Sequence, residues 1–111
     1  MDISEVTERM NRHLGVTLVA VLAGVNDRQL PRRWARGIGS APSEESAYRL
    51  MVAHRIWQII SDAESDDIAR AWFVGANACL DEQAPVTAIR SGQTRQAALA
   101  ARTFVDGAWQ G

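Results

Sequence analysis

The chain has 111 residues, of which 47% are hydrophobic, so it can bury a core and is not a disordered tail. No apolar run approaches the roughly 20 residues that are needed to cross a bilayer. The first residues are acidic and lack the apolar segment of a signal peptide. We therefore expect a protein of the cytoplasm with no membrane partner.

The formal net charge of −1 hides an uneven distribution of charge along the chain. Residues 1–60 hold eight arginines against six acids, whereas residues 61–111 hold four arginines against seven acids. All twelve basic residues are arginine, which suits bidentate contacts with phosphate or guanine. We expect the positive and the negative half to face different partners.

The titratable side chains show no catalytic or metal-binding pattern. Cys79 is the single cysteine, and between Ala78 and Leu80 it is predicted to be a small buried hydrophobe. His13 and His54 lack ligand spacing, so we expect core or surface roles for both. With no phosphate loop and no nucleophile–base pair in view, we expect neither enzyme activity nor a cofactor.

Two helices are predicted at the start of the chain. Apolar residues recur at helical spacing from Ile3 to Leu14, which predicts a helix over about residues 4–13 that Gly15 ends. Thr17 is expected to cap a second, short helix.

A sharp turn and a third helix follow. Gly24 is expected to adopt the left-handed conformation of the turn, and Asn26 or Asp27 to cap a helix that Gly37 stops. Pro31 is expected near the fifth residue of this helix, where it would shorten or kink it.

The second and third helices together fit the plan of a helix-turn-helix. Leu30 and Trp34, four residues apart, are predicted to face inward. The arginines left outside could reach phosphates or base edges, and they are Arg28, Arg32, Arg33 and Arg36. The alternative is a simple helical hairpin with a solvated arginine face, and Pro31 leaves DNA binding open.

A long helix is predicted after the loop over residues 37–42. Ser43 is its expected cap, and residues 61–67 are expected to break it. Its apolar stripe is predicted to be Ala47, Leu50, Met51, His54, Trp57 and Ile60.

Short helices complete the chain, so the predicted fold class is all-α. One or two are expected over residues 68–80, and another begins at Pro85 and ends near Gly92. The last is expected over residues 93–105, with Gly107 as its end. Four alanines make this helix thin, so that it either docks very closely or rests on bulky partner side chains: Ala97, Ala98, Ala100 and Ala101.

Several residues in fixed order carry a resemblance to a known family. In the first half they are Leu14-Gly15-Val16-Thr17, Val25, Arg28, Trp34 and Gly37. In the second half they are Ala71-Trp72-Phe73, Asn77, Leu80, Pro85, Ile89-Arg90, Gly92 and Asp106-Gly107. On these residues nearly the whole chain resembles the antitoxins of RES–Xre toxin–antitoxin pairs, which share the Xre/MbcA/ParS toxin-binding domain, and especially the MbcA-like antitoxins.

The resemblance implies three regions and a protein partner. Residues 1–42 would form an Xre-like helix-turn-helix domain, residues 43–67 a connecting long helix, and residues 68–111 the toxin-binding domain. The partner would be an NAD-degrading RES-domain toxin whose active site the antitoxin covers. Family members commonly form homodimers, and many repress their own operator DNA.

The resemblance also implies which residues bind the toxin, with the tail from Phe104 to Trp109 nearest its NAD pocket. These residues are Trp72, Arg90, Gly92, Phe104, Gly107 and Trp109.

Other roles for three of these residues compete with toxin contact. Trp72 is favoured as a core residue. Arg90 is favoured to pair locally with Asp81 or Glu82. Trp109 either anchors an interface or folds back onto its own chain. The other function that we consider is a stand-alone transcriptional regulator.

Overall fold

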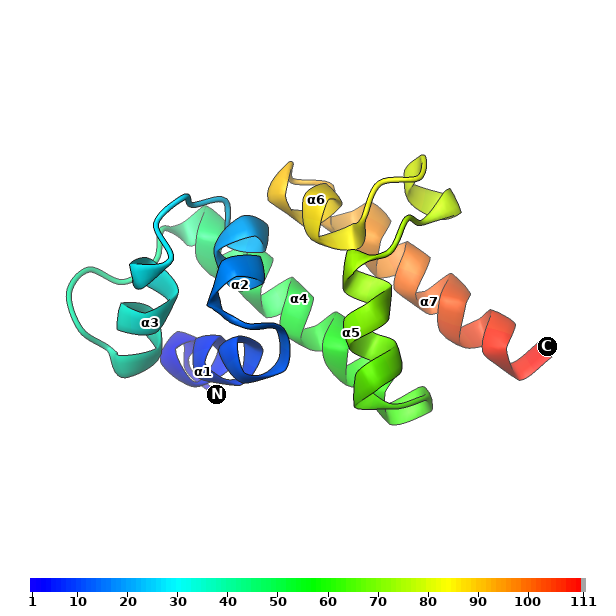
Figure 1. Cartoon of the computed structure of the whole chain (residues 1–111), viewed down its shortest axis with the longest axis horizontal. Helices are drawn as coiled ribbons and strands as arrows, with labels where there is room; N and C mark the ends of the chain where they lie inside the picture. The colour runs from blue at the N-terminus through cyan, green and yellow to red at the C-terminus, as the bar shows by residue number, and fades with distance from the viewer. Residues whose placement is uncertain (111) are drawn as a thin grey trace.

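The computed structural model describes the backbone of residues 1–110 and the side chains of residues 1–107 (Figure 1). Its fold is all-α, as the sequence predicts, and the described residues contain no strand. The helices are, in chain order, α1 (Ile3–Leu14), α2 (Val16–Ala23), α3 (Gln29–Arg36), α4 (Glu44–Ala63), α5 (Asp66–Val74), the 3-10 helix η1 (Ala78–Leu80), α6 (Pro85–Arg90) and α7 (Thr94–Gln110).

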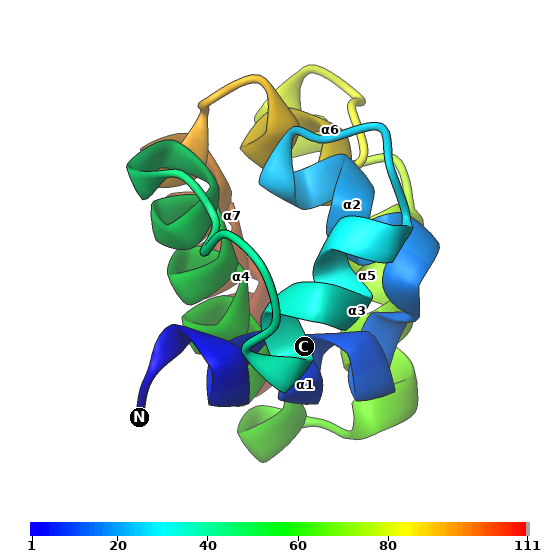
Figure 2. The ribbon, with the colours of Figure 1, turned by 90° about the vertical axis from the view of Figure 1, so that its left-hand side faces the viewer.

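The long helix α4 links two groups of helices. In Figure 1, α1, α2 and α3 gather at one end of the molecule, and α6 and α7 lie towards the other. The groups meet where α2 packs against α6, which Figure 2 shows from the α1–α3 end. One apolar core runs without a break from Val6 in α1 to Ala101 in α7. Within residues 1–110, no helix combines the length and the apolar composition that a membrane crossing requires.

Side-chain caps start three of the α-helices. The Asp2 carboxylate accepts a hydrogen bond from the Glu5 amide at 2.9 Å, and the Ser43 hydroxyl accepts one from the Ser46 amide at 3.1 Å. Ser65 caps α5 in the same way. Each cap satisfies an amide that the first turn of a helix leaves unpaired. The predicted cap at Ser43 is confirmed.

The cap predicted at Thr17 is wrong. Helix α2 begins at Val16, two residues before the start that a cap at Thr17 implies, directly after Gly15, and no side chain caps it. Gly15 has a φ of 86°, and this conformation lets the chain leave α1 and enter α2 with no intervening loop. Thr17 therefore lies inside the first turn of α2.

The turn between α2 and α3 has the predicted glycine. Gly24 ends α2 in the left-handed conformation with a φ of 86°, and a Cβ atom there would lie 2.8 Å from Nη1 of Arg49. The cap predicted at Asn26 or Asp27 is wrong, because the cap residue of α3 is Arg28 and no side chain caps the helix. Oδ1 of Asp27 receives a hydrogen bond from the Gln29 amide at 2.8 Å in the turn before it.

Pro31 is the third residue of α3 and not the fifth, so the expected kink is wrong. The first four amides of a helix have no partner within it, and a proline there costs no helical hydrogen bond. The Pro31 ring is buried, and its carbonyl accepts a hydrogen bond from Nδ2 of Asn11 at 3.0 Å. Pro31 thus helps to hold α3 against α1.

The buried face of α4 is broader than the predicted stripe. Four of the predicted positions are buried, namely Leu50, His54, Trp57 and Ile60. Ala47 is half-buried, and Met51 is 54% exposed, against the prediction. Ala53 and Ile56 are buried as well, because α4 packs against α1 and α2 on one part of its length and α5 and α7 on another.

The C-terminal helices follow the prediction except at the end of the chain. Pro85 is the first residue of α6, as expected. Helix α7 continues through Gly107 to Gln110, so Gly107 does not terminate it. A glycine within a helix costs about 1 kcal/mol relative to alanine, which weakens a helix but does not end it.

Three of the four alanines in α7 are buried. Ala97, Ala100 and Ala101 are buried where α7 packs on α4 and its neighbours, whereas Ala98 is exposed. Small side chains let two helix backbones approach closely. The sequence left two expectations for this thin helix, close docking or support from a partner's bulky side chains. The three buried alanines fit close docking within the chain.

Candidate interaction surfaces

The outer side of α3 carries an arginine face, formed by four exposed side chains: Arg28, Arg32, Arg33 and Arg36. Arg28, Arg32 and Arg36 are four residues apart and therefore lie along one side of the helix. The opposite side buries Pro31 and Trp34 against the core.

Among the described side chains, no acidic group forms an ion pair with the arginine face. The ion pairs among those side chains involve Arg12, Arg49 and Arg70, and none involves an arginine of α3. Unpaired guanidinium groups on one helix can contact successive phosphates of a nucleic acid.

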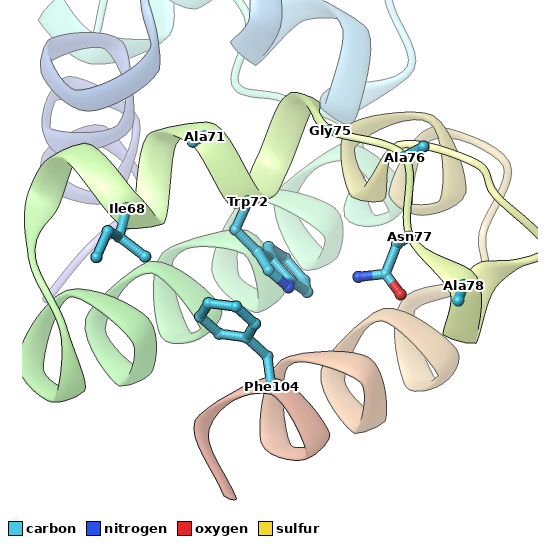
Figure 3. Close-up of a pocket in the computed structure, with 8 residues that line it drawn as sticks. All are labelled: Ile68, Ala71, Trp72, Gly75, Ala76, Asn77, Ala78 and Phe104. Carbon is cyan, nitrogen blue, oxygen red and sulfur yellow. The ribbon is translucent and has the colours of Figure 1, made fainter. Parts of the chain in front are cut away.

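An apolar groove of 410 Å³ lies between α5, the segment after it, and α7 (Figure 3). The walls are mostly small or apolar, and the lining residues are Ile68, Ala71, Trp72, Gly75, Ala76, Asn77, Ala78 and Phe104. Ile68 and Phe104 are 41% and 36% exposed. We refer to this feature as the α5–α7 groove.

Trp72 forms the floor of the groove and belongs to the core, as the sequence favoured. Its ring packs edge-on against Phe73 with a centroid distance of 5.3 Å, and the residue is only 8% exposed. The indole Nε1 is buried and has no hydrogen-bond partner among the described residues. A buried donor without a partner costs about 1–3 kcal/mol, so this N–H is a feature that calls for an explanation.

Asn77 shapes the other wall of the groove. Its backbone carbonyl accepts hydrogen bonds from the amides of Leu80 and Glu82, and its Oδ1 accepts one from the Cys79 amide at 2.9 Å. These contacts leave the Nδ2 group turned towards the indole of Trp72 (Figure 3). Asn77 therefore closes a tight turn and presents a second donor to the groove.

Cys79 is exposed, and the prediction of a buried cysteine is wrong. The residue lies in the middle of η1, on the outside of the turn that Asn77 closes, and Leu80 supplies the buried side chain of this segment. A 3-10 helix of three residues is too short to show an apolar side in its sequence pattern. The sequence therefore did not indicate that Leu80, and not Cys79, is the buried residue.

Arg90 binds the C-terminal end of α2, in the other half of the chain. Its Nη1 donates hydrogen bonds to the carbonyls of Val21 at 3.0 Å and Val25 at 3.3 Å, and its Nη2 donates one to Oδ1 of Asn26 at 2.8 Å. Carbonyls at the end of a helix lack partners and carry partial negative charge. Helix α2 has no basic residue of its own in its last turn, so Arg90 supplies the missing cation.

The expectation that Arg90 pairs locally with Asp81 or Glu82 is wrong. These two acids follow η1 in left-handed conformations, with φ of 56° and 70°, and both are exposed. The guanidinium of Arg90 is engaged by α2 in place of them.

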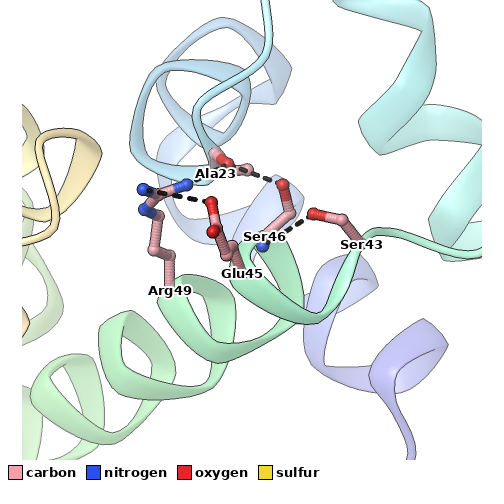
Figure 4. A network of polar contacts seen from close by, with 5 residues as sticks. All are labelled: Ala23, Ser43, Glu45, Ser46 and Arg49. Atoms are coloured by element: carbon pink, nitrogen blue, oxygen red, sulfur yellow. Dashed lines mark hydrogen bonds and ion pairs between the residues drawn. The ribbon is translucent and has the colours of Figure 1, made fainter.

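A second set of contacts holds the same end of α2 from the side of α4 (Figure 4). The Ser46 hydroxyl donates a hydrogen bond to the carbonyl of Ala23 at 2.7 Å, in a buried position. Arg49 approaches the same carbonyl at 3.5 Å and lies 3.9 Å from the carboxylate of Glu45. The end of α2 is thus held by both α4 and α6.

The residues that the resemblance assigns to toxin binding fall in different places. Trp72 and Phe104 come together in the α5–α7 groove. Arg90 and Gly92 lie at the end of α6, where Arg90 contacts α2. Gly107 is an exposed residue of α7, and the side chain of Trp109 lies outside the described residues.

Six residues of the groove were not among the predicted interaction residues: Ile68, Ala71, Gly75, Ala76, Asn77 and Ala78. Ile68 stands in the first turn of α5 and Ala71 three residues later, so both face the same side of the helix. An isoleucine that directly follows two acids in the first turn of a short helix was the available sequence signal.

The two histidines have structural surroundings. The His13 ring stacks on Trp57 with a centroid distance of 4.2 Å. Burial lowers the pKa of His13, with further lowering by His54, Arg12 and Arg70 and an opposing effect of Asp66.

His54 is buried on α4, where burial and the nearby Arg9 both lower its pKa. Among the described residues, no three side chains of His, Cys, Asp or Glu gather where they could hold a metal ion.

Comparisons with families of known proteins, with curated proteins and with solved structures find no match to this chain.

Proposed function

We propose that the chain is an antitoxin that binds an NAD-degrading RES-domain toxin and covers its active site. The observation that carries this proposal is the α5–α7 groove, an apolar surface feature with an unpartnered hydrogen-bond donor in its floor. Binding and obstruction require no reactive group on the antitoxin, so the proposed role needs only a surface.

The composition of the surface after α4 supports a protein partner. Large apolar side chains of α5 and α7 are exposed in the lining of the groove, namely Ile68 and Phe104. Exposed apolar residues of this kind, when they adjoin a groove, are typical of surfaces that a partner covers. The class of partner comes from the resemblance of residues 71–107 to the RES–Xre antitoxins.

Co-expression tests the proposal. The reading frame next to this gene is expressed alone and together with this chain, and growth and intracellular NAD are followed. We expect growth arrest and NAD loss from the neighbour alone, relief of both by this chain, and a complex that survives purification. Equal NAD loss with and without this chain would reject the antitoxin role.

We propose DNA binding as a second function, which can coexist with the first. It is favoured by the arginine face, whose four guanidinium groups are exposed along α3 and unpaired among the described side chains. As an autorepressor the chain would bind its own operator as a homodimer or in a hetero-oligomer with the toxin. A stand-alone regulator would bind DNA with no toxin partner.

A further inference from the structure

The Trp72 indole and the Asn77 amide together give the α5–α7 groove a chemical preference. Two side-chain donors belong to its lining, since the Nε1–H of Trp72 has no partner among the described residues and the Oδ1 of Asn77 is already engaged by the Cys79 amide. The remaining lining is apolar or small. A ligand that fits this lining brings an acceptor and an apolar group side by side.

We propose that the α5–α7 groove binds a short segment of a partner protein, which inserts an apolar side chain and places a backbone carbonyl on the Trp72 N–H. This inference rests on the proposed function and names the surface that contacts the toxin. The groove volume of 410 Å³ lies within the roughly 300–1,000 Å³ that is typical of ligand sites. A peptide bond next to an apolar side chain supplies both required groups at fixed spacing.

Phe104 controls access to the donor. The indole nitrogen itself is buried, and Figure 3 places the Phe104 ring beside it at the mouth of the groove. Phe104 is 36% exposed, so its side chain can rotate towards solvent. Displacement of Phe104 by the incoming side chain would open the N–H to the carbonyl.

The charge around the groove favours a different protein over a second copy of this chain. Residues 61–111 hold seven acids against four arginines, and the first turn of α5 carries Asp66 and Asp67 next to Ile68, of which Asp67 pairs with Arg70 at 3.3 Å. A two-fold contact through this surface would place like charges opposite one another, which is unfavourable. A neutral or basic segment of a partner has no such penalty.

The experiment follows the indole N–H signal of Trp72 by nuclear magnetic resonance in the full chain. The signal is assigned by its loss in Trp72→Phe. Two probes are added separately: N-acetyl-leucine methylamide, which carries an apolar side chain between two carbonyls, and the purified neighbouring toxin. We expect a downfield shift of the Trp72 signal with either probe, and no shift in Ala71→Glu, which fills the groove from an exposed position.

Affinity for the toxin gives a second readout. Trp72→Phe keeps the ring but removes the donor, and we expect binding to weaken about three- to tenfold, as for one hydrogen bond. We expect Ala71→Glu to weaken it more. Leu99→Glu, which alters an exposed apolar residue of α7 outside the groove, is the matched control and should bind like the wild type.

The outcomes distinguish a failure of the groove inference from a failure of the proposed antitoxin function. A shift with the leucine derivative but no binding of the toxin supports the groove and rejects the proposed function. A toxin complex in which Trp72 does not respond, together with no response to the derivative, overturns the groove and leaves the antitoxin role standing. A shift that Ala71→Glu leaves unchanged, or one that occurs on concentrating the protein alone, also overturns the inference, and the latter would assign the groove to a second copy.

Discussion

The guanidinium of Arg90 donates a hydrogen bond to Oδ1 of Asn26 at 2.8 Å, across 64 residues of sequence. The same side chain donates to the carbonyl of Val21 in α2 and to that of Val25 in the turn that follows. Helix α6 therefore completes the end of a helix in the other half of the chain, and the geometry of the α2–α3 turn depends on it.

Replacing Arg90 by alanine is expected to destabilise the whole chain. The change removes the hydrogen bonds that the charged guanidinium donates, including the one to a carbonyl of α2. We expect this loss to lower the free energy of unfolding by about 2 kcal/mol. The melting temperature should fall by about 8–16 °C for a chain of this size. The measurement is thermal unfolding followed by circular dichroism. Arg95→Ala, which removes an exposed arginine of α7, is the control and should melt near the wild type.

Enlarging a buried alanine of α7 is expected to disturb the packing of α7 on α4. Ala101 is fully buried, so Ala101→Leu forces extra methylene groups into a filled space and should cost about 1–3 kcal/mol. Ala98→Leu makes the same change at an exposed position of the same helix and should be nearly neutral. Urea unfolding of both variants measures the difference. Equal stabilities would show that α7 does not dock as closely as described.

Stability is expected to fall below about pH 6.5 because of the histidines. Burial lowers the pKa of both His13 and His54 in the folded chain, so the unfolded chain takes up protons first as the pH falls. The free energy of unfolding should be level above pH 6.5 on this account and decline below it. Urea unfolding at several pH values measures the slope. His13→Phe, which can keep a ring against Trp57, should make the decline shallower, and an unchanged slope would contradict the assignment.

Charge reversal on the arginine face is expected to abolish operator binding without affecting the fold. Arg32 and Arg33 are exposed, so Arg32→Glu with Arg33→Glu should melt like the wild type. Wild-type affinity for the promoter should fall with salt, with a slope of about 0.9 per neutralised phosphate. Gel retardation at several salt concentrations measures both. Promoter DNA that is not retarded by the wild type even at low salt would remove DNA binding from the proposed functions.

Removing the Phe104 ring is expected to expose the Trp72 donor. In Phe104→Ala the indole N–H loses the neighbour that covers it, and its exchange with solvent deuterium should become faster. Exchange is followed for the indole signals of Trp72 and Trp34, since Trp34 lies in the core near α1 and should not change. Unchanged exchange at Trp72 would show that another group covers the nitrogen.

Local signals in the sequence predicted the elements of the fold well. The cap at Ser43, the first-turn proline at Pro85 and the left-handed Gly24 are each confirmed, because a few adjacent atoms decide each of them. Pro31 shows the limit of such reasoning: moving the start of α3 by two residues turns an expected helix breaker into a tolerated first-turn residue.

Contacts between distant segments were beyond sequence reasoning. Nothing local indicates that Arg90 lies beside α2, and the nearby acids offered a simpler partner. The exposure of Met51 depends on where α1 and α7 leave α4 uncovered. The groove likewise arises from the docking of α7 beside α5, so its residues could be named only in part.

The contact of Arg90 with α2 also bears on how this protein can be divided. A fragment that stops before α6 lacks the hydrogen bonds of Arg90 at the end of α2, and a fragment that begins at α4 leaves Arg90 without its acceptors. Exchange of the basic N-terminal helices between related chains would therefore transfer a working unit only if position 90 and the residues that it contacts were exchanged together.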